Sequence, residues 1–216
     1  MKGILIASLL ILAGRAGIAA GASVPLHVTV YNKANVPPET TTRAAQTLRF
    51  LFAHSDVEIE WVAGNPEADE ANFVTYTGIV NKEQERRFAC RARRDIALRL
   101  LANAPASVPT AVLGFALPFA TEGVNVQIYS DHIAKAATSR NVPLPDLLAH
   151  AIAHEIGHVL LRSTAHAGNG LMAAVWKEHE YGWLTKGSMF FTTAEAATIR
   201  ESIEGARCPG TLSTKR

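Results

Sequence analysis

Hydrophobic and polar residues alternate in two short stretches near the start of the chain. Leu26, Val28 and Val30 occupy every second position of a segment that predicts a strand ending at Asn32. Apolar residues then recur at helical spacing within residues 36–55, and the alternation returns in residues 57–64. Because a helix-length connection joins these two strands, we expect them to pair in parallel.

The later pattern predicts the rest of one domain. A third strand is expected in residues 95–102, and two adjacent strands joined by a short turn are expected within residues 112–129. A long helix is predicted over residues 144–162, and a final helix opens with Thr192 and Glu195 in a capping box. Residues 65–72 are predicted to be a loop, and residues 81–94 a helix.

Histidines lie along the long helix predicted over residues 144–162. His150, His154 and His158 are four residues apart, so they form one column on a helix, and Glu155 lies about 100 degrees around the axis from His154. Two imidazoles in this H-E-x-x-H arrangement can converge on one metal ion while the glutamate stays nearby without ligating it.

The neighbours of these ionisable side chains favour a metal site over chance placement. Ile152, Ile156 and Val159 carry no charge, which indicates a helix built for burial. Burying histidines and a glutamate without compensation costs several kcal/mol, whereas a metal ion with a bound water satisfies all of them. Gly157 inside this helix indicates either the close approach of another element or a neutral choice of residue.

The segment "HEIGHVLLRSTAHAGNGLM" resembles the metzincin branch of the zincin metallopeptidases, with His166 as third ligand and Met172 in the turn beneath the metal. The resemblance implies an α+β fold: a twisted mixed sheet with an antiparallel edge strand, packed on a backing helix and the HExxH helix. It also implies Zn²⁺ and a peptide or protein substrate. The His166 to Met172 spacing is similar to that of matrixin-like members.

The segment departs from the usual family pattern between the second and third histidines. Leu161 stands where the family has a glycine, and Thr164 stands at the third-ligand position. Seven residues, rather than the usual five, separate His158 from His166. We therefore expect the helix to run further, to Arg162 or Ser163, before the chain folds back.

Other residues compete with His166 as third ligand. Glu178 lies 24 residues after His154, and thermolysin-like zincins use a downstream glutamate in this role. His179 and Glu180 are adjacent alternatives, and His150 is interpreted as a residue behind the ligands or on the surface. The Gly-Asn-Gly break and Met172 favour His166.

These residues predict a secreted zinc-dependent endopeptidase in which His154, His158 and His166 hold Zn²⁺ and Glu155 acts as general base. By resemblance, the strand around residues 114–116 is the sheet edge along which an extended peptide pairs. A zinc enzyme acting on another amide is an alternative. So is a secreted binding or structural module that holds zinc without turnover, although an intact Glu155 argues against it.

Charge and composition exclude some other classes. The net charge of +2 is too small for a nucleic-acid surface, and the arginine-rich run in residues 86–94 is interpreted as the solvated face of a helix. We expect no nucleic-acid partner, no membrane partner after processing, and a monomer.

The first 22 residues predict a secretory signal peptide. Lys2 precedes a short apolar run, and a small-residue stretch ends near Ala22. Cleavage there leaves residues 23–216 as a single catalytic domain, exported to the periplasm or the medium. Cys90 and Cys208 would then pair in an oxidising compartment, with two separate buried thiols as the alternative.

Overall fold

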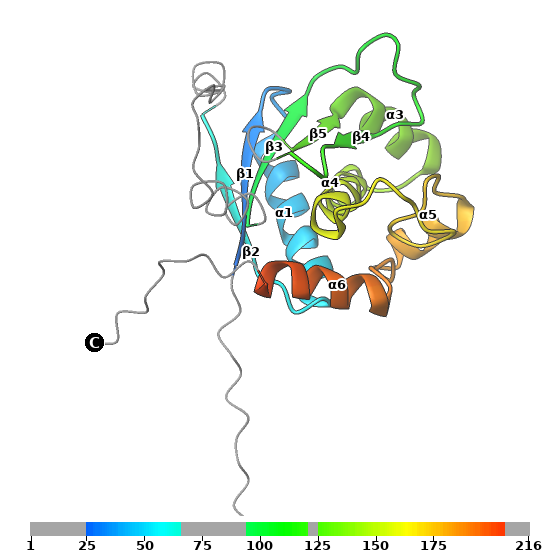
Figure 1. The fold of residues 1–216 in the computed structure, drawn as a ribbon. Helices are drawn as coiled ribbons and strands as arrows, with labels where there is room; N and C mark the ends of the chain where they lie inside the picture. The colour runs from blue at the N-terminus through cyan, green and yellow to red at the C-terminus, as the bar shows by residue number, and fades with distance from the viewer. Residues whose placement is uncertain (1–24, 66–93, 121–124, 206–216) are drawn as a thin grey trace, which may run out of the picture.

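A computed structural model of the chain describes residues 25–65, 94–120 and 125–205 (Figure 1). The predicted signal peptide, residues 81–93 of the helix predicted over residues 81–94, and both Cys90 and Cys208 lie outside the described residues. The described residues contain the strand, helix and strand pattern predicted at the start and the helix that carries the histidines.

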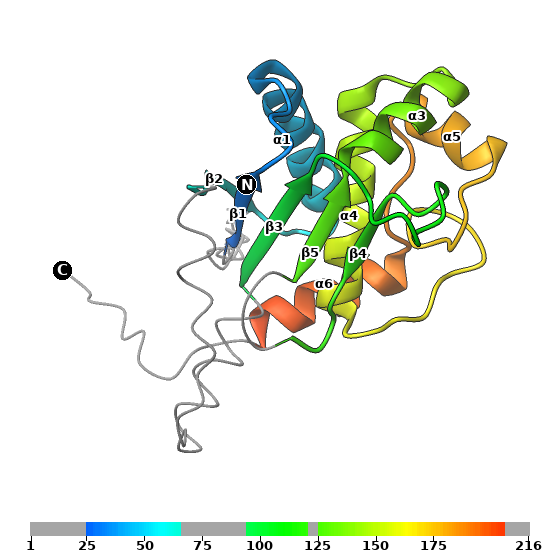
Figure 2. The same ribbon diagram turned by 90° about the horizontal axis from the view of Figure 1, so that it is seen from above.

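The described residues form a mixed sheet, as predicted. Its strands are β1 (Leu26–Asn32), β2 (Ile59–Ala63), β3 (Asp95–Leu101), β4 (Gly114–Ala116) and β5 (Val126–Tyr129), in the order β2-β1-β3-β5-β4. β1 pairs in parallel with β2 and β3, β3 pairs in parallel with β5, and only the edge strand β4 is antiparallel. Figure 2 shows β4 at the border of the sheet, beside β5.

Two helices pack together and cover one face of the sheet. They are α1 (Pro38–Ala53), whose buried residues form a stripe at helical spacing, and α4 (Leu144–Leu161), which contacts β4 and β5. α4 is buried on nearly all sides rather than on one stripe. Polar side chains on α4 therefore need partners inside the protein, because they have little access to water.

Three further helices surround this core: α3 (Ser130–Arg140), α5 (Glu178–Thr185) and α6 (Thr193–Glu204). The capping box of α6 forms as predicted, since Glu195 N donates to Thr192 Oγ1 and Thr192 N donates to the Glu195 carboxylate. No helix was predicted at α3 or α5. Of the helices in the described ranges, none is both long and apolar enough to cross a membrane.

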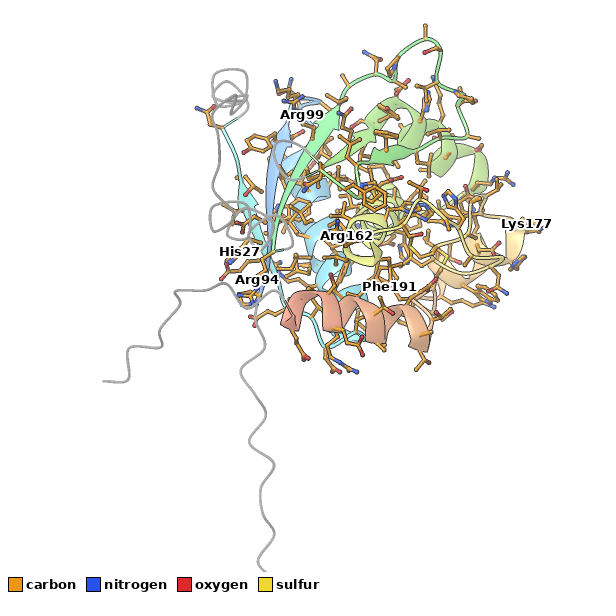
Figure 3. All side chains as sticks on the ribbon, viewed as in Figure 1. His27, Arg94, Arg99, Arg162, Lys177 and Phe191 are labelled. Carbon is orange, nitrogen blue, oxygen red and sulfur yellow. The ribbon has the colours of Figure 1, made fainter. Side chains whose placement is uncertain are left out.

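The end of α4 corrects one prediction. The helix ends at Leu161, and Arg162, which is labelled in Figure 3, caps it with a positive φ of 49°. The predicted extension to Arg162 or Ser163 is therefore wrong. A left-handed conformation at Arg162 reverses the chain one residue after the position where the resemblance expects a glycine.

Candidate metal centre

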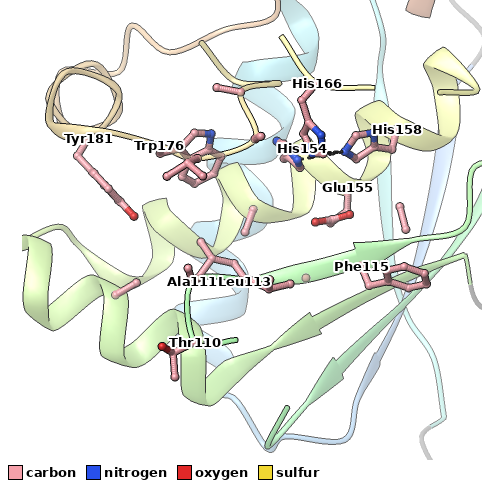
Figure 4. A pocket seen from close by; sticks show the side chains of 18 of the residues that line it. Thr110, Ala111, Leu113, Phe115, His154, Glu155, His158, His166, Trp176 and Tyr181 are labelled. Atoms are coloured by element: carbon pink, nitrogen blue, oxygen red, sulfur yellow. Dashed lines mark hydrogen bonds between the residues drawn. The ribbon is translucent and has the colours of Figure 1, made fainter. Parts of the chain in front are cut away.

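Helix α4 and the segment that follows it bring three of the predicted residues together. His158 Nε2 lies 3.2 Å from His154 Nε2 and 3.2 Å from His166 Nε2. The ligand atoms of all three lie within 4.8 Å of one another (Figure 4). Within the described ranges, this is the only group of three or more histidine, cysteine or carboxylate side chains that could hold a metal ion.

Two of these rings are oriented by backbone carbonyls. His154 Nδ1 lies 2.7 Å from Leu171 O, and His158 Nδ1 lies 2.7 Å from Ser163 O. A carbonyl can only accept, so each Nδ1 carries the proton and each Nε2 presents a lone pair. Lone pairs only 3.2 Å apart repel each other unless a cation lies between them.

The spacing and type of these donors fit zinc. Two nitrogens bound at about 2.0–2.1 Å in a tetrahedral site are about 3.3–3.4 Å apart. Three protein ligands leave the fourth position open, as in catalytic rather than structural zinc sites. The carbonyls that fix the rings are the outer partners that such histidines ordinarily have.

Burial keeps these imidazoles in the form that binds metal. It lowers the pKa of His154 to about 4, against the hydrogen bond to Leu171, and the neighbouring His158 and His166 lower it further. Burial also lowers the pKa of His158. Neutral imidazoles at neutral pH have their lone pairs free for ligation.

Glu155 lies on α4 beside the three rings and faces β4 (Figure 4). Burial raises the pKa of its carboxyl to about 8. A cation held by the histidines would lower this pKa again, because opposite charge favours the carboxylate. Gly114 gives the side chain room, since a Cβ at that position would lie 3.0 Å from Glu155 Cγ.

The turn between His158 and His166 is held together by hydrogen bonds among its own residues. Ser163 N donates to His158 O at 3.2 Å, while Ser163 O accepts from the His158 ring. Ala165 N donates to Ser163 Oγ at 3.0 Å. These bonds accommodate the two additional residues and still return His166 to the helix, so Thr164 is not needed as a ligand.

Met172 packs against Gly157 of α4, the helix that carries His154 and His158. Its side chain is 2% exposed, and a Cβ on Gly157 would lie 2.5 Å from its sulfur and 2.9 Å from Phe191 Cε1. Gly157 is therefore explained by the close approach of another element rather than by a neutral choice of residue.

The competing third ligands do not join the three histidines. Glu178 is exposed at the first position of α5. Glu180 is buried and accepts from the backbone N–H groups of Lys177 and Gly170, and His179 Nε2 lies 2.6 Å from its carboxylate. Burial on its own would raise the pKa of Glu180, but these contacts outweigh it and hold the pKa below its usual range. Glu180 thus connects α5 to the Gly170 turn.

His150 also lies apart from the metal site, and it is not on the surface. It is 1% exposed, and its Nδ1 lies 2.7 Å from Asp146 O in the same helix. Its Nε2 has no hydrogen-bond partner. Burial lowers the pKa of this ring.

The three histidines open into a cleft of about 740 Å³. β4 and the segment before it form one wall, residues 173–176 form the opposite wall, and α3 closes one end. Trp176, Tyr181 and Arg140 contribute to this cleft, and sequence reasoning missed them because their segments carry no motif.

Comparison with known proteins agrees with this description of the fold. No family model matches the chain, and no curated protein matches it. The structure of a zinc-dependent peptidase from Methanocorpusculum labreanum matches with a TM-score of 0.53 at 13% identity, over 80% of this chain and 99% of that one. Archaemetzincin from Methanopyrus kandleri gives a TM-score of 0.46 at 13% identity, over 87% and 99%. The first match shows that the chain has the fold of a zinc-dependent peptidase.

Proposed function

We propose that the protein is a zinc-dependent endopeptidase in which His154, His158 and His166 hold the metal. The convergence of three Nε2 atoms, two of them set as lone-pair donors by backbone carbonyls, carries this proposal. Their position in a large cleft and the name of the Methanocorpusculum structure support a peptidase. The His166 to Met172 arrangement favours a metzincin-like enzyme, exported as its first 22 residues predict.

Glu155 is the general base of the proposed reaction. Zinc held by the three histidines would supply Lewis-acid chemistry, by which a peptide carbonyl would be polarised and a water made more acidic. The Glu155 carboxylate takes a proton from the attacking water and delivers it to the amine that leaves. No other carboxylate among the described residues lines the cleft, so this role falls to Glu155.

The edge strand β4 positions the substrate in this proposal. β4 is hydrogen-bonded to β5 on one side, and all three of its residues line the cleft. An extended peptide can add to such an edge through backbone hydrogen bonds, with side chains alternating between the two faces. Binding through the backbone leads us to expect that many peptide sequences are accepted at these positions.

The test combines metal content with hydrolysis. We would measure zinc by mass spectrometry and cleavage of a peptide library by the wild type, Glu155→Gln, His166→Ala and Glu178→Ala. We expect one zinc and cleavage in the wild type, zinc without cleavage in Glu155→Gln, and loss of zinc in His166→Ala. Glu178→Ala is the matched control and should resemble the wild type.

Two results would change the assignment. Zinc without cleavage of any peptide in the wild type would indicate a binding module rather than a peptidase. Loss of zinc in Glu178→Ala, with zinc retained in His166→Ala, would show that the third ligand is Glu178 rather than His166.

A further inference from the structure

The cleft continues from the metal centre to the end of α3. The Trp176 ring centroid lies 5.9 Å from that of His154, and the Tyr181 centroid lies 6.3 Å from that of Trp176. The Arg140 guanidinium carbon lies 5.1 Å from the Tyr181 centroid. Figure 4 shows Trp176 between His154 and Tyr181, so this row of side chains leads away from the histidines.

The α3 end of the cleft carries positive charge. Lys135 and Arg140 line it, and Glu155, at the metal centre, is the only carboxylate among the described lining residues. Lys135 is already paired with Asp131 at 3.3 Å. Arg140 forms no ion pair with a described residue; it is exposed and contacts the face of Tyr181.

A purely structural explanation of Arg140 accounts for only part of this arrangement. A cation in the last turn of a helix is favoured by the helix dipole, and Arg140 is the last residue of α3. The dipole does not require the side chain to lie in a cleft against a tyrosine. Burial raises the pKa of Tyr181 although the adjacent Arg140 lowers it. A tyrosine is protonated at neutral pH, so its hydroxyl can donate to an anion held beside Arg140.

We propose that Arg140 and Tyr181 form a subsite for a carboxylate of the peptide substrate. The inference rests on the proposed peptidase function and names its substrate class, which is peptides with a negative charge near the scissile bond. An extended chain advances about 3.3 Å per residue, so a group a few residues from the bond can reach this end of the cleft. Either an acidic side chain or a C-terminal carboxylate supplies this chemistry.

The experiment compares matched peptides with matched variants. Peptides of one cleavable sequence would carry Glu, Gln or Lys at each position near the cleaved bond, with the C-terminus free or amidated. The variants are Arg140→Gln and Arg140→Glu. Arg43→Gln is the control, because Arg43 is an exposed arginine on α1 that does not line the cleft. Zinc content and circular dichroism would verify that each variant is folded and loaded.

We expect kcat/KM of the wild type to favour one Glu position over Gln by about tenfold, as for a hydrogen-bonded charge pair. Arg140→Gln should remove this preference, Arg140→Glu should shift it to Lys, and Arg43→Gln should leave it unchanged. A preference for the free over the amidated C-terminus, lost in Arg140→Gln, would identify the terminal carboxylate as the group bound.

Failure of this inference differs from failure of the proposed function. Equal cleavage of Glu, Gln and Lys peptides at every position, with either C-terminus, would overturn the subsite and leave the peptidase intact. If the wild type cleaves no peptide, the subsite can still be tested by measuring the binding of the same peptides by calorimetry. Tighter binding of a carboxylate, lost in Arg140→Gln, supports the subsite, and equal binding overturns it.

Discussion

The two halves of α4 place the same residue type in different surroundings. In the first half, His150 bonds to a carbonyl of its own helix and leaves its Nε2 without a partner. In the second half, His154 and His158 bond to carbonyls beyond the helix, and their Nε2 atoms meet. The difference lies in the segment 163–172, which crosses the second half of α4 and supplies both of these carbonyls. Histidine spacing supplies the donors, and the crossing segment orients them.

The strongest test of this difference is to remove one histidine ring from each half of α4. We expect His158→Ala to weaken zinc binding by more than about 100-fold, because losing a direct ligand should cost more than losing one of its supporting partners. His150→Leu should leave zinc affinity unchanged. Competition with a chromophoric chelator measures both affinities, and an equal loss in the two variants would contradict the division of α4.

The pH dependence of stability tests the surroundings of Glu155, which lies in the second half of α4. Unfolded histidines, with a pKa of 6.5, are about nine-tenths neutral at pH 7.5. From pH 7.5 upward to about pH 9, the buried Glu155 carboxyl, whose pKa is about 8, still holds a proton that the unfolded chain has lost. The native state then binds more protons, so the free energy of unfolding falls as pH rises through this window, by on the order of 1 kcal/mol.

Urea unfolding of the metal-free protein at the two ends of this pH window measures the fall. Glu155→Gln should abolish it, since glutamine does not titrate. Zinc should also suppress it, because a nearby cation lowers the pKa of the carboxyl. A fall of the same size in Glu155→Gln would assign the effect to another group.

Gly157 offers a smaller test of the crossing segment. Alanine is the better helix former by about 1 kcal/mol, yet the added Cβ would meet Met172 and Phe191. We expect Gly157→Ala to destabilise the fold by about 1 kcal/mol, because overpacking costs more than the helix gains. A double-mutant cycle with Met172→Ala should show coupling. Additive changes would mean that the two side chains do not compete for space.

The smallest effect is expected in the first half. His150→Leu removes one hydrogen bond but also a buried nitrogen without a partner, so the free energy of unfolding should change by less than about 1 kcal/mol. Chemical denaturation measures this change. A loss above about 2 kcal/mol would mean that His150 Nε2 has a partner in solution.

The sequence predicted the parts of this molecule whose patterns are local. The alternation in β1 and the stripe on α1 reflect one buried face each, and the i, i+4 spacing of His154 and His158 follows from helix geometry. The parallel pairing of β1 with β2 followed from the helix between them. His166 was placed by its distance from Met172 in the resemblance.

Other parts depend on tertiary contacts that no local pattern records. In α3 only His132, Ile133 and Ala137 are buried, which is too short a stripe to predict a helix. The turn at Arg162 was placed too late, because an arginine gives no sign of a positive φ. Arg140 reaches the cleft because α3 lies against α4, an arrangement set by the sheet.

The backbone carbonyl of Leu171 links the candidate metal site to a fluorescent side chain. Leu171 O accepts from His154 Nδ1 at 2.7 Å and from the Trp176 indole at 3.2 Å, and the Trp176 ring lies edge-on to His154. A change in the charge or position of the His154 ring therefore reaches a fluorophore through a shared acceptor. We therefore expect the intrinsic fluorescence of Trp176 to change when the site binds metal, so that metal loading can be followed without an added dye.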